Sequence, residues 1–173
     1  MNKYRIMWQH FPKHSPCSGF FTRVISCFEK VSTEIASPEN VGQTSNEVLA
    51  KVRKGLEELG FAVETSKTSD GKIKVPVLYG ANGKIEKSFD ADAYNLKEKT
   101  VVEVEAGRGV SNYQFLKDLF QACVMQEVDY AVIAIRQDYR GSDDYSKVIT
   151  FIETIYASNR LILPLKGLLI IGY

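Results

Sequence analysis

The sequence is poor in the residues and runs that mark several common classes of protein. Its 173 residues include only two histidines and three cysteines, none of them in a C-x-x-C pair, so neither a zinc site nor a disulfide framework is indicated. No apolar run approaches the roughly 18–20 residues of a membrane span, and no secretory-signal pattern follows the first basic residues. Neither a P-loop nor a G-x-G-x-x-G fingerprint occurs. We therefore expect reduced thiols, a cytoplasmic location, no membrane contact and no organic cofactor.

Neither sign of charge dominates the chain as a whole. It carries 22 basic and 21 acidic residues, and 45% of its residues are hydrophobic, a composition typical of a globular protein rather than a disordered or fibrous one. Residues 1–28 hold four basic residues and no acid, and Pro12, Pro16 and Pro38 interrupt this part of the chain. We expect residues 1–40 to form an irregular basic segment packed on the core, and residues 41–173 to form a single domain.

Two capping boxes indicate where helices begin after residue 40. Thr44 and Glu47 form a T-x-x-E box, and Ser111 with Gln114 forms a similar pair. Each box satisfies two backbone amides that a helix start leaves without partners. Apolar residues at helical spacing follow both boxes, and a third such pattern covers 143–157. The sequence therefore predicts three helices in this part of the chain.

Strand patterns lie between these helices. Apolar alternation or continuous apolar runs predict strands over 61–65, 73–79, 84–94, 100–106, 130–135 and 165–173. The pair Asn82-Gly83 predicts a hairpin turn, because both residues tolerate the positive φ angles of a tight turn. Helices that alternate with strands predict an α/β fold, a mixed sheet with helices packed on its faces.

Four carboxylates gather on two successive predicted strands. Glu103 and Glu105 alternate with apolar residues, so they share one strand face about 6.7 Å apart. Asp90 and Asp92 share a face of the preceding strand, and the turn at 95–99 folds that strand back toward them. Two such charges at 4 Å repel by about 4 kcal/mol at an effective dielectric of 20. Oxygen ligands without imidazole or thiolate suit Mg²⁺ or Mn²⁺ as the neutralising ion.

An E-x-E pair on a strand is most often a solvated face. Two features favour a functional interpretation here. The patterns at 130–135 and 168–171 indicate strands buried on both faces, so acids on a neighbouring central strand need an explanation. The acids also stand directly before Gly107 and a helix start, where strand ends commonly carry function.

The acids and the order of elements resemble the PD-(D/E)XK nuclease superfamily. Asp92, followed after ten residues by Glu103-Val104-Glu105, is similar to its acid on one hairpin strand and (D/E)-x-K on the next. Residues 44–135 also resemble its α-β-β-β-α-β core. The resemblance implies a restriction-endonuclease-like mixed β-sheet core flanked by helices, and a nuclease-like domain over 41–173.

The sequence departs from the family pattern at two positions. Ala91 stands where a proline usually precedes the acid, and Glu105 replaces the usual lysine. The second departure resembles BamHI-type restriction enzymes, which carry an acid there. Alternatively, the basic role has moved to Lys117 on the next predicted helix, although a solvated helix lysine is the commoner case. Glu47 is a further alternative catalytic acid.

The resemblance implies a role for each acid. Asp92 and Glu103 would hold Mg²⁺, with Mn²⁺ as a substitute, and Glu105 would ligate it or orient water; Asp90 competes with Asp92. Phosphates of double-stranded DNA would be contacted by basic residues on the hairpin and after the acids: Lys72, Lys74, Lys84, Lys87 and Arg108. The same lysines would also keep exposed strand edges soluble, which is the competing interpretation.

The leading hypothesis is therefore a metal-dependent endonuclease that hydrolyses DNA phosphodiester bonds, of a type II restriction-like kind. A cutter of palindromic sites would need a two-fold homodimer, so that one site faces each strand. The alternative is a catalytically inactive nuclease-fold protein that binds DNA without cutting it. A third hypothesis is a small α/β protein whose acidic patch serves an unrelated role.

Overall fold

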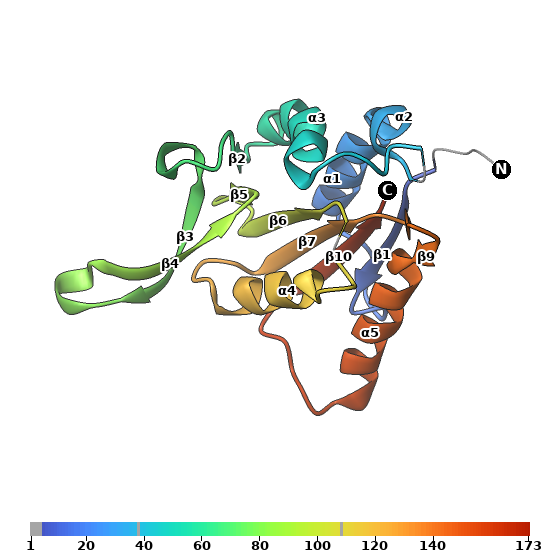
Figure 1. Ribbon diagram of the computed structural model, residues 1–173. Helices are drawn as coiled ribbons and strands as arrows, with labels where there is room; N and C mark the ends of the chain where they lie inside the picture. The colour runs from blue at the N-terminus through green and yellow to red at the C-terminus, as the bar shows by residue number, and fades with distance from the viewer. Residues whose placement is uncertain (1–4, 38, 108) are drawn as a thin grey trace.

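A six-stranded mixed sheet forms the centre of the molecule, which is described here by a computed structural model over residues 5–37, 39–107 and 109–173 (Figure 1). Its spatial order is β1 (Met7–Phe11), β10 (Gly167–Gly172), β7 (Tyr130–Ile135), β6 (Thr100–Glu105), β5 (Ala93–Asn95) and β2 (Ala62–Val63). Strands β10, β7 and β6 run parallel, whereas β1, β5 and β2 run antiparallel to their neighbours. The predicted α/β class with a mixed sheet is confirmed.

Helices cover both faces of this sheet (Figure 1). Helices α1 (Gly19–Lys30) and α3 (Ser45–Glu58) pack on one face, and the short α2 (Ser32–Ile35) lies beside α3. Helices α4 (Gln114–Val124) and α5 (Asp144–Ser158) pack on the other. Side chains of β7 and β10 alternate between the two cores, and Ala131 to Ile135 as well as all of β10 are buried. The prediction that these two strands are covered on both faces is confirmed.

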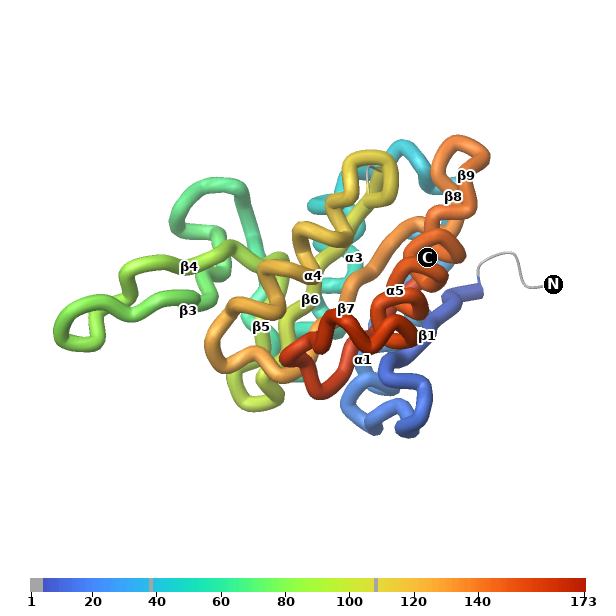
Figure 2. Tube along the Cα trace, turned by 90° about the horizontal axis from the view of Figure 1, so that it is seen from below, coloured from blue at the N-terminus to red at the C-terminus, as the bar shows by residue number. Residues whose placement is uncertain are grey.

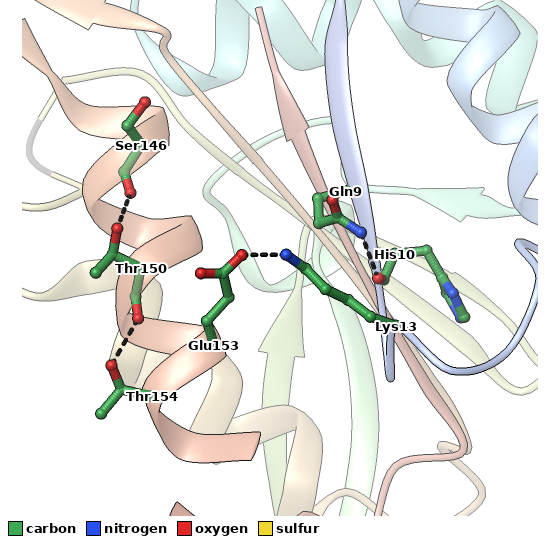
Figure 3. A network of polar contacts seen from close by, with 7 residues as sticks. All are labelled: Gln9, His10, Lys13, Ser146, Thr150, Glu153 and Thr154. Atoms are coloured by element: carbon green, nitrogen blue, oxygen red, sulfur yellow. Dashed lines mark hydrogen bonds and ion pairs between the residues drawn. The ribbon is translucent and has the colours of Figure 1, made fainter. Parts of the chain in front are cut away.

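The first forty residues are more regular than the sequence indicated. Strand β1 pairs with the edge of β10, and α1 begins where the Ser18 hydroxyl accepts a hydrogen bond from the Phe21 amide. Pro12 and Pro16 lie in the loop between these elements, so they interrupt neither. An ion pair between Lys13 of that loop and Glu153 of α5 ties the segment to the opposite layer (Figure 3). The expected irregular segment is corrected to a strand and a helix of the main fold.

The two capping boxes have different outcomes. Thr44 and Glu47 form the reciprocal box that starts α3, as predicted. The box expected at Ser111 is wrong, because α4 begins at Gln114 and no side chain caps it. The backbone turns first: the Tyr113 amide donates to the Val110 carbonyl, and Tyr113 itself adopts the left-handed conformation at φ 52°.

A separate two-stranded hairpin projects from the sheet (Figures 1 and 2). It consists of β3 (Ile73–Tyr79) and β4 (Ile85–Ala91). Its turn carries Asn82 at φ 58° and Gly83 at φ 72°, as the Asn-Gly pair predicts. The single strand expected over 84–94 is broken at Asp92, where the chain bends from β4 into β5.

Short elements complete the chain. Two 3-10 turns, η1 (Ser69–Gly71) and η2 (Ala81–Gly83), flank β3, and a small hairpin of β8 (Asp138–Tyr139) and β9 (Ser142–Asp143) precedes α5. Within the described ranges, no helix has both the length and the apolar character needed to cross a bilayer.

Candidate active site

A polar cavity of about 430 Å³ lies where β4 bends into β5, on the face of β6 that α4 covers. Six acids and three lysines line it, beside a smaller number of polar and apolar residues. Asp92, Glu103 and Glu105 all reach this cavity, together with the alternatives Asp90 and Lys117. The structure therefore brings together residues from the hairpin, the central sheet and α4.

Asp92 occupies the bend between the two sheets. Its Oδ2 accepts a hydrogen bond of 2.7 Å from the Val104 amide of β6, and its carbonyl oxygen accepts one of 2.7 Å from the Glu64 amide. These bonds fix the side chain against the central strand. Burial raises the pKa of Asp92 to about 7, and the Glu64 charge adds to the rise, although the Val104 hydrogen bond opposes it.

Asp90 lies two residues earlier and behaves differently. It is exposed on β4, and its carboxylate forms an ion pair with Lys72 across the hairpin. The bend at Asp92 breaks the strand that the two aspartates were expected to share, although both line the cavity. Between the two candidates, Asp92 is the buried acid held against β6.

Glu103 is a buried acid of the cavity, on the central strand β6. The residue Glu103 is 9% exposed. It lies opposite Ile133, where β6 pairs with β7. The Oε1 atom is buried and has no hydrogen-bond partner among the described residues. Burial raises the pKa of Glu103 well above its ordinary value, and the Asp92 charge raises it further. An unpaired buried acceptor of this kind costs free energy in the folded protein.

Glu105 shares the cavity with an acid that sequence reasoning missed, Asp118 of α4. The two carboxyl groups interact closely enough to affect each other's ionisation, and Asp118 is only 2% exposed. Burial raises the pKa of Glu105 to about 8, and the nearby Asp118 charge contributes. Burial also raises the pKa of Asp118, although Lys117 opposes that shift. Its Oδ2 is buried without a partner among the described residues.

Lys117 provides the positive charge nearest these acids. Its Nζ lies 3.3 Å from Asp118 Oδ1, and the residue lines the cavity. Burial lowers the pKa of Lys117, but the charges of Asp118, Glu105 and Glu103 outweigh that effect and the net shift is upward. Lys117 is therefore a cation at neutral pH, and it lies beside the acids of the cavity.

The chemistry of the donors suits a hard cation. All the acidic groups in the cavity provide oxygen ligands. Two buried carboxylate oxygens, Glu103 Oε1 and Asp118 Oδ2, have no hydrogen-bond partner among the described residues. As the side chains stand, the described part of the chain contains no group of three or more His, Cys, Asp or Glu residues that could hold a metal ion. Asp92 and Glu103 are the residues that would bind Mg²⁺, after side-chain adjustment.

The remaining predicted residues fall into three groups. Glu47 is committed to its capping box, where its carboxylate accepts from the Thr44 amide at 2.7 Å, and it is not among the described residues that line the cavity. Lys72 and Lys87 line the cavity, whereas Lys74 and Lys84 are exposed on the hairpin outside it. Arg108 lies outside the described residues.

The sequence did contain a signal for Asp118. Phe115, Leu119 and Ala122 follow one another at spacings of four and three and are buried, so they define the inner face of α4. Asp118 lies three residues after Phe115 and four before Ala122, on that same face. Phe120, the apolar residue next to Leu119, is by contrast 58% exposed.

Comparison with models of known protein families and with curated protein sequences finds no match for the chain.

Proposed function

We propose that this protein is a Mg²⁺-dependent endonuclease that hydrolyses phosphodiester bonds in DNA, related to the PD-(D/E)XK nucleases. The observation that carries the proposal is the enclosed acid cluster beside β6. Five carboxyl groups with raised pKa values share one cavity there, and Glu103 keeps a buried, unpaired oxygen. Stability alone gives no reason to gather acids in this way, whereas cation binding does.

The order of elements supports the family assignment. From α3 onward the chain forms β2, β5 and β6, then α4, then β7 parallel to β6, with the hairpin inserted between β2 and β5. The acids follow this order as the family pattern requires: Asp92 directly precedes β5, and Glu103 and Glu105 lie in β6. Both features were part of the resemblance seen in the sequence.

Each acid has a distinct role in the proposed reaction. A bound Mg²⁺ supplies charge neutralisation at the phosphoryl group and lowers the pKa of water. Asp92 and Glu103 would hold the cation through their carboxylates. Glu105, whose pKa of about 8 suits proton transfer near neutral pH, accepts a proton from the attacking water. Asp118, whose carboxyl group lies beside that of Glu105, would position it.

Lys117 supplies the positive charge that the E-x-E motif lacks. The family lysine would lie at position 105, where this chain has an acid, and Lys117 approaches the same cavity from α4. Its ammonium group stabilises negative charge on the phosphoryl oxygens. In the proposed enzyme, Lys117 would thus compensate for the absence of the usual lysine.

A cleavage assay tests the proposal. Plasmid and duplex oligonucleotides are incubated with Mg²⁺, Mn²⁺ or EDTA, using wild type, Glu103→Gln and the control Glu57→Gln on the exposed side of α3. We expect metal-dependent cutting that falls by at least about 100-fold in Glu103→Gln and is unchanged in Glu57→Gln. Discrete bands would indicate a restriction-like enzyme.

Two outcomes would contradict it. DNA binding in a gel shift without cutting in any metal would favour the catalytically inactive nuclease-fold protein. Equal cutting by wild type and Glu103→Gln would remove the acid cluster from the reaction.

A further inference from the structure

An open apolar groove adjoins the acid cavity. It has a volume of about 520 Å³, within the range of small-molecule sites, roughly 300–1,000 Å³. Phe89 of β4 and the outer side of α4 form its walls. Three residues, Phe89, Lys117 and Gln121, line both the groove and the acid cavity. A ligand can therefore occupy both at once, with a charged part among the acids and lysines and an apolar part in the groove.

The groove presents two exposed aromatic side chains. Tyr113 is 62% exposed and Phe120 is 58% exposed, and Leu116 and Val124 lie between or beside them. The Gln121 side chain makes no hydrogen bond to the other described residues, so its amide is open to a ligand in the shared wall. Flat apolar walls with one amide suit a planar, hydrogen-bonding ring.

Tyr113 also occupies an unfavourable backbone position. It adopts φ 52° and ψ 32° at the N-cap of α4, where Ser, Thr, Asp or Asn would supply a capping oxygen. A left-handed conformation is unfavourable for a bulky residue. The tyrosine at this position therefore departs from both local preferences, as residues at functional sites often do.

We propose that this groove binds the base of the nucleotide next to the scissile phosphate, and that the substrate is therefore DNA in which this base is unpaired. The inference rests on the proposed function. Tyr113 and Phe120 stack on the base, Gln121 meets its polar edge, and Lys117 contacts the adjoining phosphate from the shared wall. A base inside the groove has left the stack of a duplex, so a single strand or an extruded nucleotide is the form that fits.

Charge favours this occupant over a second protein surface. A protein docked on the groove would cover the Lys117–Asp118 ion pair and the edge of the acid cavity, and would further desolvate carboxylate oxygens that lack hydrogen-bond partners. A nucleotide instead places a phosphate within reach of Lys117, Lys72 and Lys87, which line the polar side together with six acids. The apolar and charged parts of a nucleotide match the two halves of this surface.

Binding of matched oligonucleotides in EDTA tests the proposal without any cleavage. Fluorescein-labelled oligothymidylate and an abasic strand of equal length carry the same phosphates, and only the first carries bases. By fluorescence anisotropy, we expect wild type to bind the base-bearing strand about 5- to 100-fold more tightly than the abasic one. Phe120→Ala and Tyr113→Ala should remove most of this preference and leave abasic binding unchanged.

Further variants separate stacking from folding. Phe120→Leu keeps an apolar side chain but loses the ring, and should lose most of the preference as well. Trp8→Ala alters an exposed aromatic residue on β1, at the other edge of the sheet, and should keep the preference. Circular dichroism of each variant verifies that the fold is retained.

Three outcomes would overturn the proposal. The first is equal affinity of the wild type for the two strands, and the second is an equal loss of affinity for both strands in the groove variants. The third is a change from dimer to monomer in Phe120→Ala, measured by sedimentation. The last would identify the groove as a contact between copies of this chain. A protein that prefers bases but never cuts would refute the nuclease and leave the groove intact. One that cuts without the preference would refute only the groove.

Discussion

Asp92 shows how a single bend decides the chemistry of a residue. Two positions apart on a continuous strand, Asp90 and Asp92 would share an environment. The chain instead bends at Asp92, so Asp90 forms an ion pair with Lys72 in the exposed hairpin, while Asp92 turns into the cavity and accepts from Val104. The pKa of Asp92 rises to about 7 because of this burial.

The two aspartates therefore form a matched pair of test sites. We expect Asp92→Asn to reduce metal-dependent cleavage by at least about 100-fold, because the amide cannot neutralise a cation. Asp90→Asn should change the rate by less than about threefold, because its loss affects an exposed ion pair of small energetic value. Initial rates on one duplex substrate measure both. Equal and mild effects would mean that neither aspartate binds the metal.

At the residue scale, local patterns predicted the acids of the strands but not those of the helix. Alternation placed Glu103 and Glu105 on one face of β6, because a strand has a period of two. Asp118 was missed because an acid between Lys117 and Leu119 reads as part of a solvated helix surface. Its burial depends on how α4 lies over β6, which is a tertiary property. Tyr113 escaped notice for a similar reason, since Ser111 offered a plausible cap.

At the scale of elements, the hairpin of β3 and β4 is a separate arm that projects from the sheet (Figure 2). Its strand β4 lines the acid cavity. Lys74 and Lys84 are exposed on it, outside the cavity. A duplex bound at the acids would pass along this arm, where each lysine that meets a phosphate releases counterions. The arm therefore contributes affinity rather than chemistry.

Charge reversal on the arm tests that role. We expect the double variant Lys74→Glu/Lys84→Glu to weaken DNA binding and to reduce the salt slope of log K by about two. The double variant Lys30→Glu/Lys54→Glu, on α1 and α3 of the opposite layer, has the same net charge and should bind as wild type. Gel shifts at several salt concentrations give both slopes. Equal slopes for the two variants would exclude the arm from the DNA interface.

Elements with strong local signals were predicted well, and those that depend on partners were not. The Thr44–Glu47 box, the Asn82-Gly83 turn and the apolar strands β7 and β10 all carry their information in adjacent residues. Strand β1 lacks such a signal: it exists because β10 offers an edge to pair with, far away in sequence. The break at Asp92 likewise follows from pairing, since β4 pairs with β3 and β5 pairs with β6.

At the scale of the whole molecule, the sheet buries acidic side chains, and their burial lowers the stability of the folded protein. Strands β6, β7 and β10 form a rigid parallel centre with helices on both faces, so the carboxyl groups on β6 cannot withdraw into water. Buried, mutually repelling acids retain protons instead, and their pKa values rise. Affinity for protons, and for a cation that replaces them, is therefore built into the fold.

This cost predicts an unusual dependence of stability on pH. The folded protein holds protons on Asp92 up to a pKa of about 7 and on Glu105 up to about 8, whereas the same groups release them near pH 4 when unfolded. Between these limits the folded state binds more protons, so the free energy of unfolding falls as pH rises. For Asp92 alone, the rise in pKa lowers the free energy of unfolding by about 4 kcal/mol across this pH range.

Thermal unfolding in EDTA between pH 5 and pH 8 measures this dependence. We expect Tm to fall toward pH 8, and Mn²⁺ or Mg²⁺ to restore it there, since a cation at 100 times its Kd contributes about 2.7 kcal/mol. In Glu103→Gln, both the fall in Tm toward pH 8 and its recovery with metal should be smaller. The variant lacks one buried ionisable group, and Asp92 has lost a neighbour that repels it. A wild-type Tm that rises steadily to pH 8, with no response to either metal, would mean that the acids ionise freely in water and that the cluster binds no cation.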